Sequence, residues 1–294
     1  MHKTVNQRLK KYMPVNILRM ATLFRSFVLK NNKKDGLAFY HPKQNNRLLV
    51  LGNGPSLNGT IDSNFEKLQH YDLMVVNQFA ISDYFEMLRP QYYVLADPVY
   101  YAKNDGFRRE LSQLISAIKA KTKWELTIFL SEEAKESKLV NSLKNFTNIK
   151  FVFYSGNRIH YEWFENKKLF KLLNKDMIEP PAQTVINTAL SIGIYYKYKK
   201  IYIIGADTSW HEEYIIDQDT NDMYIESKHF YGNRKKLYKR HTKNTSNMGE
   251  EFFSISKVFF FYHFLQEYAM NNQSKIYNSS EFSWIDVFDR RDLE

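Results

Sequence analysis

The stretch LLVLGNGPSL, residues 48 to 57, joins an apolar run to a glycine-rich turn. Its four leading apolar residues show no polar alternation, which is typical of a parallel strand covered on both faces. Gly52 and Gly54 permit positive φ and a close approach of a ligand to the main chain, which leaves Asn53 to face that ligand. The stretch therefore predicts a first strand with a phosphate-side turn. A plain tight turn is the alternative, because the spacing matches neither GxGxxG nor GxxxxGK[ST].

Similar apolar runs recur along the chain, at residues 72–77, 92–96, 126–130, 150–154, 201–204 and 275–278. Helical patterns separate them, at residues 81–88, 106–120, 161–174, about 183–196 and about 250–270, and a terminal helix is expected around Trp284, Ile285 and Phe288. Ser131 is a candidate N-cap. This alternation predicts an α/β fold, a Rossmann-like and mostly parallel sheet with helices on both faces.

Polar residues follow several of the predicted strands. Asn77 follows the second strand, Asp97 the third, and Gly205 with Asp207 the run at 201–204. Parallel strands deliver such residues to one edge of a sheet, although each of them alone is also a common turn former. The helix that begins near Gln183 or Thr184 would point its N-terminal amides at a phosphate.

The composition narrows the class of protein. The 294 residues are 44% hydrophobic and 25% charged, which suits a globular chain, and they contain no cysteine, which excludes disulfides and thiolate zinc sites. No run approaches 18 apolar residues, and no secretory signal is evident, so a cytoplasmic location is expected. The net charge of +10 favours an anionic partner such as nucleic acid, anionic lipid or a sugar nucleotide.

An N-terminal segment, residues 1–46, is distinguished by its charge. It carries nine Lys or Arg residues before position 35 and no acid before Asp35, and apolar residues from Val15 to Leu29 approximate one helical stripe. Such a basic amphipathic helix predicts peripheral attachment to the inner face of the cytoplasmic membrane. Packing on the following domain, residues 47–294, or on another subunit is the alternative.

Residues 217–247 lose the regular pattern and gather bases among aromatic residues. The bases are Lys228, His229, Arg234, Lys235, Lys236, Lys239, Arg240, His241 and Lys243. A long insertion of this kind is commonly a lid or a binding loop, and its composition suits an anionic ligand with rings or hydroxyls. RNA binding without catalysis is the alternative from another class of protein.

Four motifs, taken in order, resemble the bacterial sialyltransferases of glycosyltransferase family 42. They are GNGPSL from Gly52, VNQF around Asn77, IYIIGAD ending at Asp207 and HTKNT from His241. The resemblance implies a nucleotide-sugar transferase fold (a GT-A-like variant) with a lid. It also implies inverting, metal-independent transfer of a nonulosonic acid from a CMP-sugar to an oligosaccharide or glycolipid acceptor, as in lipopolysaccharide or capsule synthesis.

The same resemblance implies roles for individual residues. His241 would be the general base and Tyr238 a phosphate contact, and a neutral imidazole suits proton transfer near pH 7. The resemblance and the polar residues that follow the predicted strands together imply a set of residues that bind the donor. They are Gly52, Asn53, Gly54, Asn77, Asp97, Gln183, Thr184, Gly205, Asp207 and Tyr214.

The chain departs from that family at three places. Asp97 replaces an asparagine, and Thr184, Val185 and Ile186 stand in place of the family's TSG. Thr208, Ser209 and Trp210 stand in place of an aromatic pair, for which Tyr214 is a candidate substitute. Sialic acid, Kdo, legionaminic acid, pseudaminic acid and a different nucleotide sugar therefore stay open as the donor. Another nucleotide-handling enzyme with a GNGPSL motif is a further alternative. No cofactor or metal is expected, since the DQD of residues 217–219 carries little weight as a metal motif.

Overall fold

A computed structural model of the chain describes residues 35–42, 45–101, 109–159, 161, 167–181, 183–229, 232–239 and 247–294. Within these ranges, the side chains of residues 227–229 and 232–239 are excluded from the description. The predicted amphipathic helix in residues 1–34 and the predicted base His241 lie outside the described residues.

The central feature is an eight-stranded sheet in the order β11-β10-β6-β1-β2-β3-β4-β5, with every neighbouring pair parallel. Its strands are β1 (Arg47–Leu51), β2 (Asp72–Val76), β3 (Tyr92–Val94), β4 (Leu126–Ser131), β5 (Ile149–Tyr154), β6 (Lys200–Ile204), β10 (Lys275–Asn278) and β11 (Asp289–Arg290). The chain runs outward from β1 to β5 and returns to the other side of β1 with β6. The predicted α/β fold is confirmed, and its switch point lies between β1 and β6.

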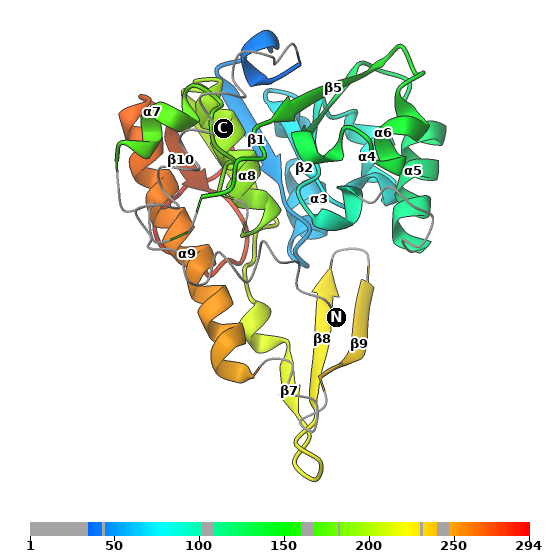
Figure 1. Cartoon of the computed structure of the whole chain (residues 1–294), viewed down its shortest axis with the longest axis vertical. Coiled ribbons are helices and arrows are strands. Elements are labelled where there is room, and N and C mark those ends of the chain that lie inside the picture. The colour runs from blue at the N-terminus through cyan, green and yellow to red at the C-terminus, as the bar shows by residue number, and fades with distance from the viewer. Residues whose placement is uncertain are drawn as a thin grey trace, which may run out of the picture.

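Helices cover both faces of this sheet (Figure 1). Leu49 and Leu51 of β1 face a core shared with α3 (Leu57–Leu68), α4 (Tyr84–Leu88), α5 (Arg109–Lys121) and α6 (Lys138–Leu143). Leu48 and Val50 face a second core with α7 (Leu169–Leu173), α8 (Val185–Tyr195) and α9 (Met248–Asn271). All four apolar residues of β1 named above are completely buried, which explains why this strand has no polar alternation.

Short 3-10 turns complete the connections: η2 (Leu37–Phe39), η3 (Phe79–Ile81), η4 (Pro98–Tyr101), η5 (Glu132–Ala134) and η7 (Trp210–Glu212). Ser131 caps η5 by accepting the N–H of Glu133, as its sequence position suggested. The predicted helix at 81–88 is divided into η3 and α4. Of the helix predicted at 161–174, the described part is helical at α7.

The predicted C-terminal helix is wrong. Ile285 and Phe288 are buried, but this segment is an extended loop that leads into β11. Its main chain bonds to neighbouring elements, with Trp284 N–H donating to the Asp207 carbonyl and Arg291 N–H donating to the Asn278 carbonyl. Apolar spacing alone did not distinguish this arrangement from a helix, because the tertiary hydrogen bonds decide it.

The expected irregular lid contains a regular β-hairpin. The strands β7 (Tyr214–Ile216), β8 (Met223–His229) and β9 (Gly232–Lys239) form an antiparallel sheet, seen in yellow beyond the edge of the main sheet in Figure 1. The sequence did not predict these strands because charged and polar residues interrupt the apolar pattern of β8 and β9. A strand needs alternating apolar residues only where one face packs on a core.

Residues 35–42 pack against the main sheet. Leu37 is buried, its N–H donates to the Asp176 carboxylate at 3.3 Å, and Phe153 N–H of β5 donates to the Asp35 carbonyl at 2.9 Å. Among the helices of the described residues, none has the length and apolar character needed to cross a bilayer.

Candidate functional site

A cavity of about 390 Å³, here called the strand-end pocket, lies at the carboxyl ends of β1, β2, β3 and β6. The chain segments that follow these strands contribute its walls, and the first turn of α8 and Tyr262 of α9 contribute the rest. This is the switch-point position expected for a ligand site in an open parallel sheet.

The glycines after β1 serve a different purpose from the one predicted. Neither Gly52 nor Gly54 has positive φ, and Gly205 is the glycine that does, at +62°. A Cβ on Gly52 would lie 2.2 Å from the carbonyl oxygen of Gly205, and one on Gly54 would lie 2.6 Å from the Asp207 carboxyl carbon. The two glycines therefore admit the main chain that follows β6, and this close contact fixes the floor of the pocket.

Several main-chain amides of this turn are engaged within the protein. Gly52 donates to the Ile204 carbonyl and Gly54 to the Gly205 carbonyl, both at 2.8 Å, while Leu57 donates to Gly54. The N–H groups of Gly52 and Gly54 are therefore not free for a phosphate, while the predicted phosphate-side turn as a whole stays a prediction. These N–H groups join the β1 and β6 turns to one another instead of facing a ligand.

Asp207 anchors the same junction. Its carboxylate accepts the N–H of Ser56 at 3.0 Å and also the Ser56 hydroxyl. The side chain is buried, and this burial raises the pKa of Asp207 although the hydrogen bonds from Ser56 oppose the effect. Because its two oxygens are held by Ser56, Asp207 positions the β1 turn at the edge of the pocket.

Three amide side chains that line the pocket each have an oxygen without a hydrogen-bond partner in the described part of the chain. Asn53 Oδ1, Asn77 Oδ1 and Gln78 Oε1 are buried and have no hydrogen-bond partner among the described residues. Asn53 is oriented because its Nδ2 donates to the Val76 carbonyl at 3.1 Å, and Gln78 because its Nε2 donates to the Tyr100 hydroxyl at 3.2 Å. Unpaired buried acceptors are costly unless a ligand completes them. They make this part of the lining the candidate contact for a ligand with N–H or O–H donors.

Asn77 occupies a left-handed backbone position, with φ of 48°. Its N–H donates to the Val94 carbonyl, and its own carbonyl accepts the Tyr93 hydroxyl at 2.5 Å. Asparagine tolerates this conformation better than most residues. The neighbouring strand β3 thereby holds the acceptor side chain of Asn77 at the pocket.

The N-terminus of α8 forms the opposite wall. Thr184 is its N-cap, with a hydroxyl that accepts the Asn187 N–H and a main-chain N–H that donates back to the Asn187 side chain. Val185 and Ile186 follow and line the pocket. The first amides of a helix have no intrahelical acceptor, so this wall offers partial positive charge.

The charged residues of the described lining are acidic: Asp97, Glu110, Asp207 and Glu213. Neither Lys nor Arg occurs among these lining residues. An anionic ligand would therefore depend on the α8 amides, and on any cation from segments outside the described residues.

The pocket brings together seven of the predicted donor residues: Asn53, Gly54, Asn77, Asp97, Thr184, Gly205 and Asp207. Gly52 instead lies behind the wall, and Gln183 lines a neighbouring cavity and donates to the Ser254 hydroxyl at 2.9 Å. Tyr214 is part of β7 and donates to the Glu251 carboxylate at 3.1 Å. The donor-binding roles of all ten predicted residues stay predictions.

Tyr238 has a described main chain within β9. Met223 pairs with Lys239 and Tyr224 with Leu237, so Tyr238 is the extra residue of a β-bulge. The side chain of Tyr238 lies outside the described part of the chain, so its phosphate role stays a prediction.

The acidic turn at residues 217–219 has a structural explanation. Asp217 Oδ1 accepts the N–H groups of Asp219 and Thr220 and the Thr220 hydroxyl, at 2.8 to 3.1 Å. Among the described residues, no group of three or more His, Cys, Asp or Glu side chains is arranged to hold a metal.

Sequence reasoning missed several lining residues. They are Gln78, Tyr100, Glu110, Trp210, Glu213 and Tyr262. The position of Gln78 directly after Asn77 was a usable signal. The others come from helices or turns whose orientation toward the pocket depends on tertiary packing.

The sequence matches no protein-family profile, and no curated protein matches it. Its fold is similar to that of the MAf glycosyltransferase from Magnetospirillum magneticum AMB-1, with a TM-score of 0.50 over 85% of this chain. The two chains are 12% identical, and the match spans 34% of that protein. The chain thus shares the fold of about a third of that protein, whereas the resemblance to family 42 stays a prediction.

Proposed function

We propose that the chain is an inverting glycosyltransferase that takes a nonulosonic acid-type sugar from a CMP-sugar and attaches it to a hydroxyl of a glycan or glycolipid. The observation that carries this proposal is the set of three buried, unpaired amide oxygens on side chains that line the strand-end pocket. The family resemblance supplies the type of donor, and the glycosyltransferase-like fold supports the class of reaction.

The amide oxygens favour cytosine over uracil. Cytosine carries an exocyclic amine at position 4, whereas uracil carries a carbonyl oxygen at that position. An amine donates to acceptors such as Asn53 Oδ1 and Asn77 Oδ1, while a carbonyl would leave them unpaired. A site built to pair a donor rejects an analogue that lacks it.

The phosphate of the donor is proposed to lie at the N-terminus of α8. Val185 and Ile186 line the pocket there, and the helix begins with a complete capping box. In this arrangement, the base lies toward the ends of β1 and β2 while the phosphate receives the first amides of the helix.

The transfer forms a bond between the acceptor oxygen and the anomeric carbon of the donor sugar. The bond from that carbon to the phosphate oxygen breaks, and CMP leaves with the electron pair. His241 is proposed to receive the proton of the acceptor hydroxyl, and Tyr238 to contact the departing phosphate. The basic lid residues would supply positive charge near that phosphate.

The direct test is incubation of the full chain with CMP-sugars and a mixture of oligosaccharide and glycolipid acceptors, with CMP release as the readout. We expect release that depends on both substrates and persists in a chelator. Turnover with UDP-sugars or ADP-sugars in place of CMP-sugars would contradict the proposal. Salt-sensitive RNA binding without CMP release would favour the non-catalytic alternative.

Asn77→Gly tests the proposed hydrogen bond between the cytosine amine and Asn77 Oδ1. Glycine accepts the left-handed backbone of position 77, so the change removes the acceptor oxygen without backbone strain. We expect CMP affinity to fall about 3- to 10-fold, the equivalent of one hydrogen bond, while UMP affinity changes little. Calorimetric titration with the two nucleotides measures both.

Asn46→Gly is the matched control for that variant. Asn46 also has positive φ, at 55°, but lies before β1 at the opposite edge of the sheet. Its replacement should leave both affinities unchanged. Equal losses for CMP and UMP in Asn77→Gly would contradict the selective contact with cytosine.

Membrane attachment through residues 1–34 is a separate part of the proposal. Each cation near an anionic surface contributes about 1 kcal/mol, so replacing the nine bases of this segment by Gln should lower binding to phosphatidylserine vesicles more than 10-fold. Vesicle sedimentation measures the binding, and activity on a soluble acceptor should persist. Vesicle binding equal to that of the unmodified chain would refute the attachment.

A further inference from the structure

A second cavity, of about 370 Å³, adjoins the strand-end pocket and is here called the Glu179 cavity. The two are separated by one layer of residues. Asp97 lines the first while Ala96 and Pro98 line the second, and Thr184 lines the first while Gln183 lines the second. Neighbouring residues of α9 divide in the same way, with Tyr262 on one side and Phe261 on the other.

A buried carboxylate and a guanidinium face this second cavity. The side chain of Glu179 is 6% exposed, and it accepts a hydrogen bond from Arg158 Nε at 2.9 Å. The same guanidinium contacts Glu133 at 3.2 Å, and the Arg158 side chain stays 57% exposed. A carboxylate accepts hydrogen bonds from hydroxyl groups, and a guanidinium donates hydrogen bonds to hydroxyl oxygens. The pair therefore suits neighbouring hydroxyls of a sugar.

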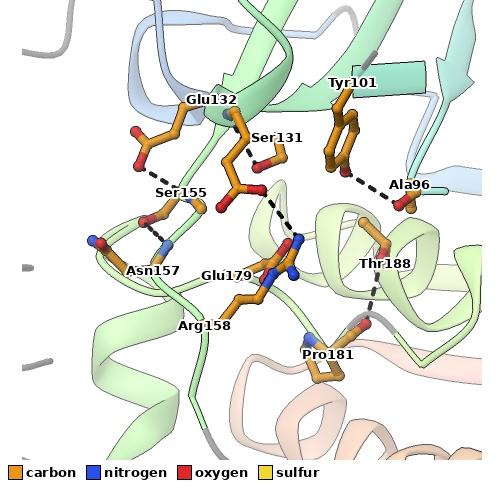
Figure 2. Close-up of polar contacts among 12 residues, drawn as sticks. Ala96, Tyr101, Ser131, Glu132, Ser155, Asn157, Arg158, Glu179, Pro181 and Thr188 are labelled. Carbon is orange, nitrogen blue, oxygen red and sulfur yellow. Dashed lines mark hydrogen bonds and ion pairs between the residues drawn. The ribbon is translucent and has the colours of Figure 1, made fainter. Parts of the chain in front are cut away.

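The segment that carries Glu179 is held rigidly. Glu179 N–H donates to the Asn157 carbonyl at 3.0 Å, and the Pro181 carbonyl accepts the Thr188 hydroxyl of α8 at 3.3 Å (Figure 2). Pro180 and Pro181 further restrict the main chain. The carboxylate is therefore positioned before any ligand arrives, which lowers the entropic cost of binding.

An aromatic wall completes the cavity. The rings of Tyr161 and Phe253 meet edge to face at 5.7 Å, and Lys257 Nζ of α9 lies 5.5 Å and 5.0 Å from their centres. Tyr161 and Lys257 both line the cavity. An aromatic ring offers an apolar surface for the C–H face of a pyranose, and the ammonium group adds a hydrogen-bond donor.

Resting on the proposed function, we propose that the Glu179 cavity is the acceptor subsite, where a pyranose lies against Tyr161 and its hydroxyls bond to Glu179, Arg158 and Lys257. Transfer requires the two reacting atoms to come within about 3.5 Å, so the reacting hydroxyl must extend from the Glu179 cavity past the residues that divide it from the donor pocket. Glu179 is a binding residue in this arrangement, and His241 keeps the proton-transfer role.

The test is saturation-transfer NMR with methyl glycosides of glucose, galactose, mannose and N-acetylglucosamine, on the full chain with and without CMP. We expect at least one glycoside to bind the unmodified chain. Glu179→Gln and Lys257→Met should each weaken that binding at least 5-fold, with CMP affinity within 2-fold of the original. Lys119→Met, on an exposed position of α5, is the matched control and should change neither value.

Glycoside binding should also depend on pH. Burial raises the pKa of Glu179 to about 7, although Arg158 opposes this shift, while Glu132 and Glu133 of η5 reinforce it. The ionised carboxylate is the better acceptor, so the affinity should rise up to about 10-fold from pH 6 to pH 8. In Glu179→Gln, where the side chain does not titrate, this rise should disappear.

The outcomes separate the two proposals. Glycosides that bind equally well to the unmodified chain, Glu179→Gln and Lys257→Met would overturn the subsite, as would the absence of binding by every glycoside. Normal CMP binding in either case would leave the donor pocket intact. Glycoside binding that responds to the variants, in a chain that binds no CMP, would support the subsite and overturn the proposed donor.

Discussion

Gly52→Ala should destabilise the chain by about 3 kcal/mol or more, because the new methyl group has no room. Its Cβ would lie 2.2 Å from the carbonyl oxygen of Gly205, which belongs to the main chain and cannot rotate away as a side chain can. The added methyl would separate the turns after β1 and β6, and would break the bond from Gly52 N–H to the Ile204 carbonyl. Urea unfolding followed by far-ultraviolet circular dichroism measures the change.

Gly59→Ala is the matched control for the clash. Gly59 lies within α3, and a Cβ there would meet the end of the flexible Glu281 side chain at 3.3 Å. Alanine favours a helix over glycine by about 1 kcal/mol, so this variant should be as stable as the original chain or slightly more stable. Equal stability of Gly52→Ala and Gly59→Ala would show that the two turns are not packed as described.

His241→Ala should lower kcat by about 10²- to 10⁴-fold, the usual contribution of a general base. CMP affinity should change less than 3-fold, since the base acts on the acceptor and not on the nucleotide. The expectation rests on the HTKNT motif, because His241 lies outside the described residues. Initial rates of CMP release, together with CMP titration, separate the chemical step from binding.

His70→Ala provides the control for that measurement, because His70 is exposed at the edge of the sheet opposite the strand-end pocket. Its kcat should equal that of the original chain. Added imidazole should partly restore His241→Ala if the missing group is a proton acceptor. A kcat within a few-fold of the original would exclude His241 as the base.

The strand-end pocket illustrates how similar sequence signals can have different physical origins. GNGPSL predicted a turn that exposes amides to a phosphate, yet Gly52 and Gly54 donate their N–H groups to the β6 turn. Sequence shows that these positions need small residues, but not whether a ligand or another strand approaches them. The structure adds a different feature, the unpaired buried oxygens of Asn53, Asn77 and Gln78, whose side chains line the pocket.

The Glu179–Arg158 pair was invisible in the sequence for a related reason. The two residues are 21 positions apart and belong to loops without a recognisable motif. They meet because the loop after β5 and the loop before α8 pack side by side, as the bond between Glu179 N–H and the Asn157 carbonyl shows. Contacts between distant loops depend on packing that a local pattern does not contain.

The sequence by itself determined the alternation of strands and helices, the two-sided burial of the sheet and the gathering of Asn53, Asn77 and Thr184 at one edge. These follow from local apolar runs and from the rule that parallel strands end together. Tertiary structure alone decided the packing of the β1 and β6 turns, the hairpin in the basic insertion and the extended C-terminus. In each of these, long-range hydrogen bonds or close main-chain contacts outweigh local preference, and no short stretch of sequence encodes them.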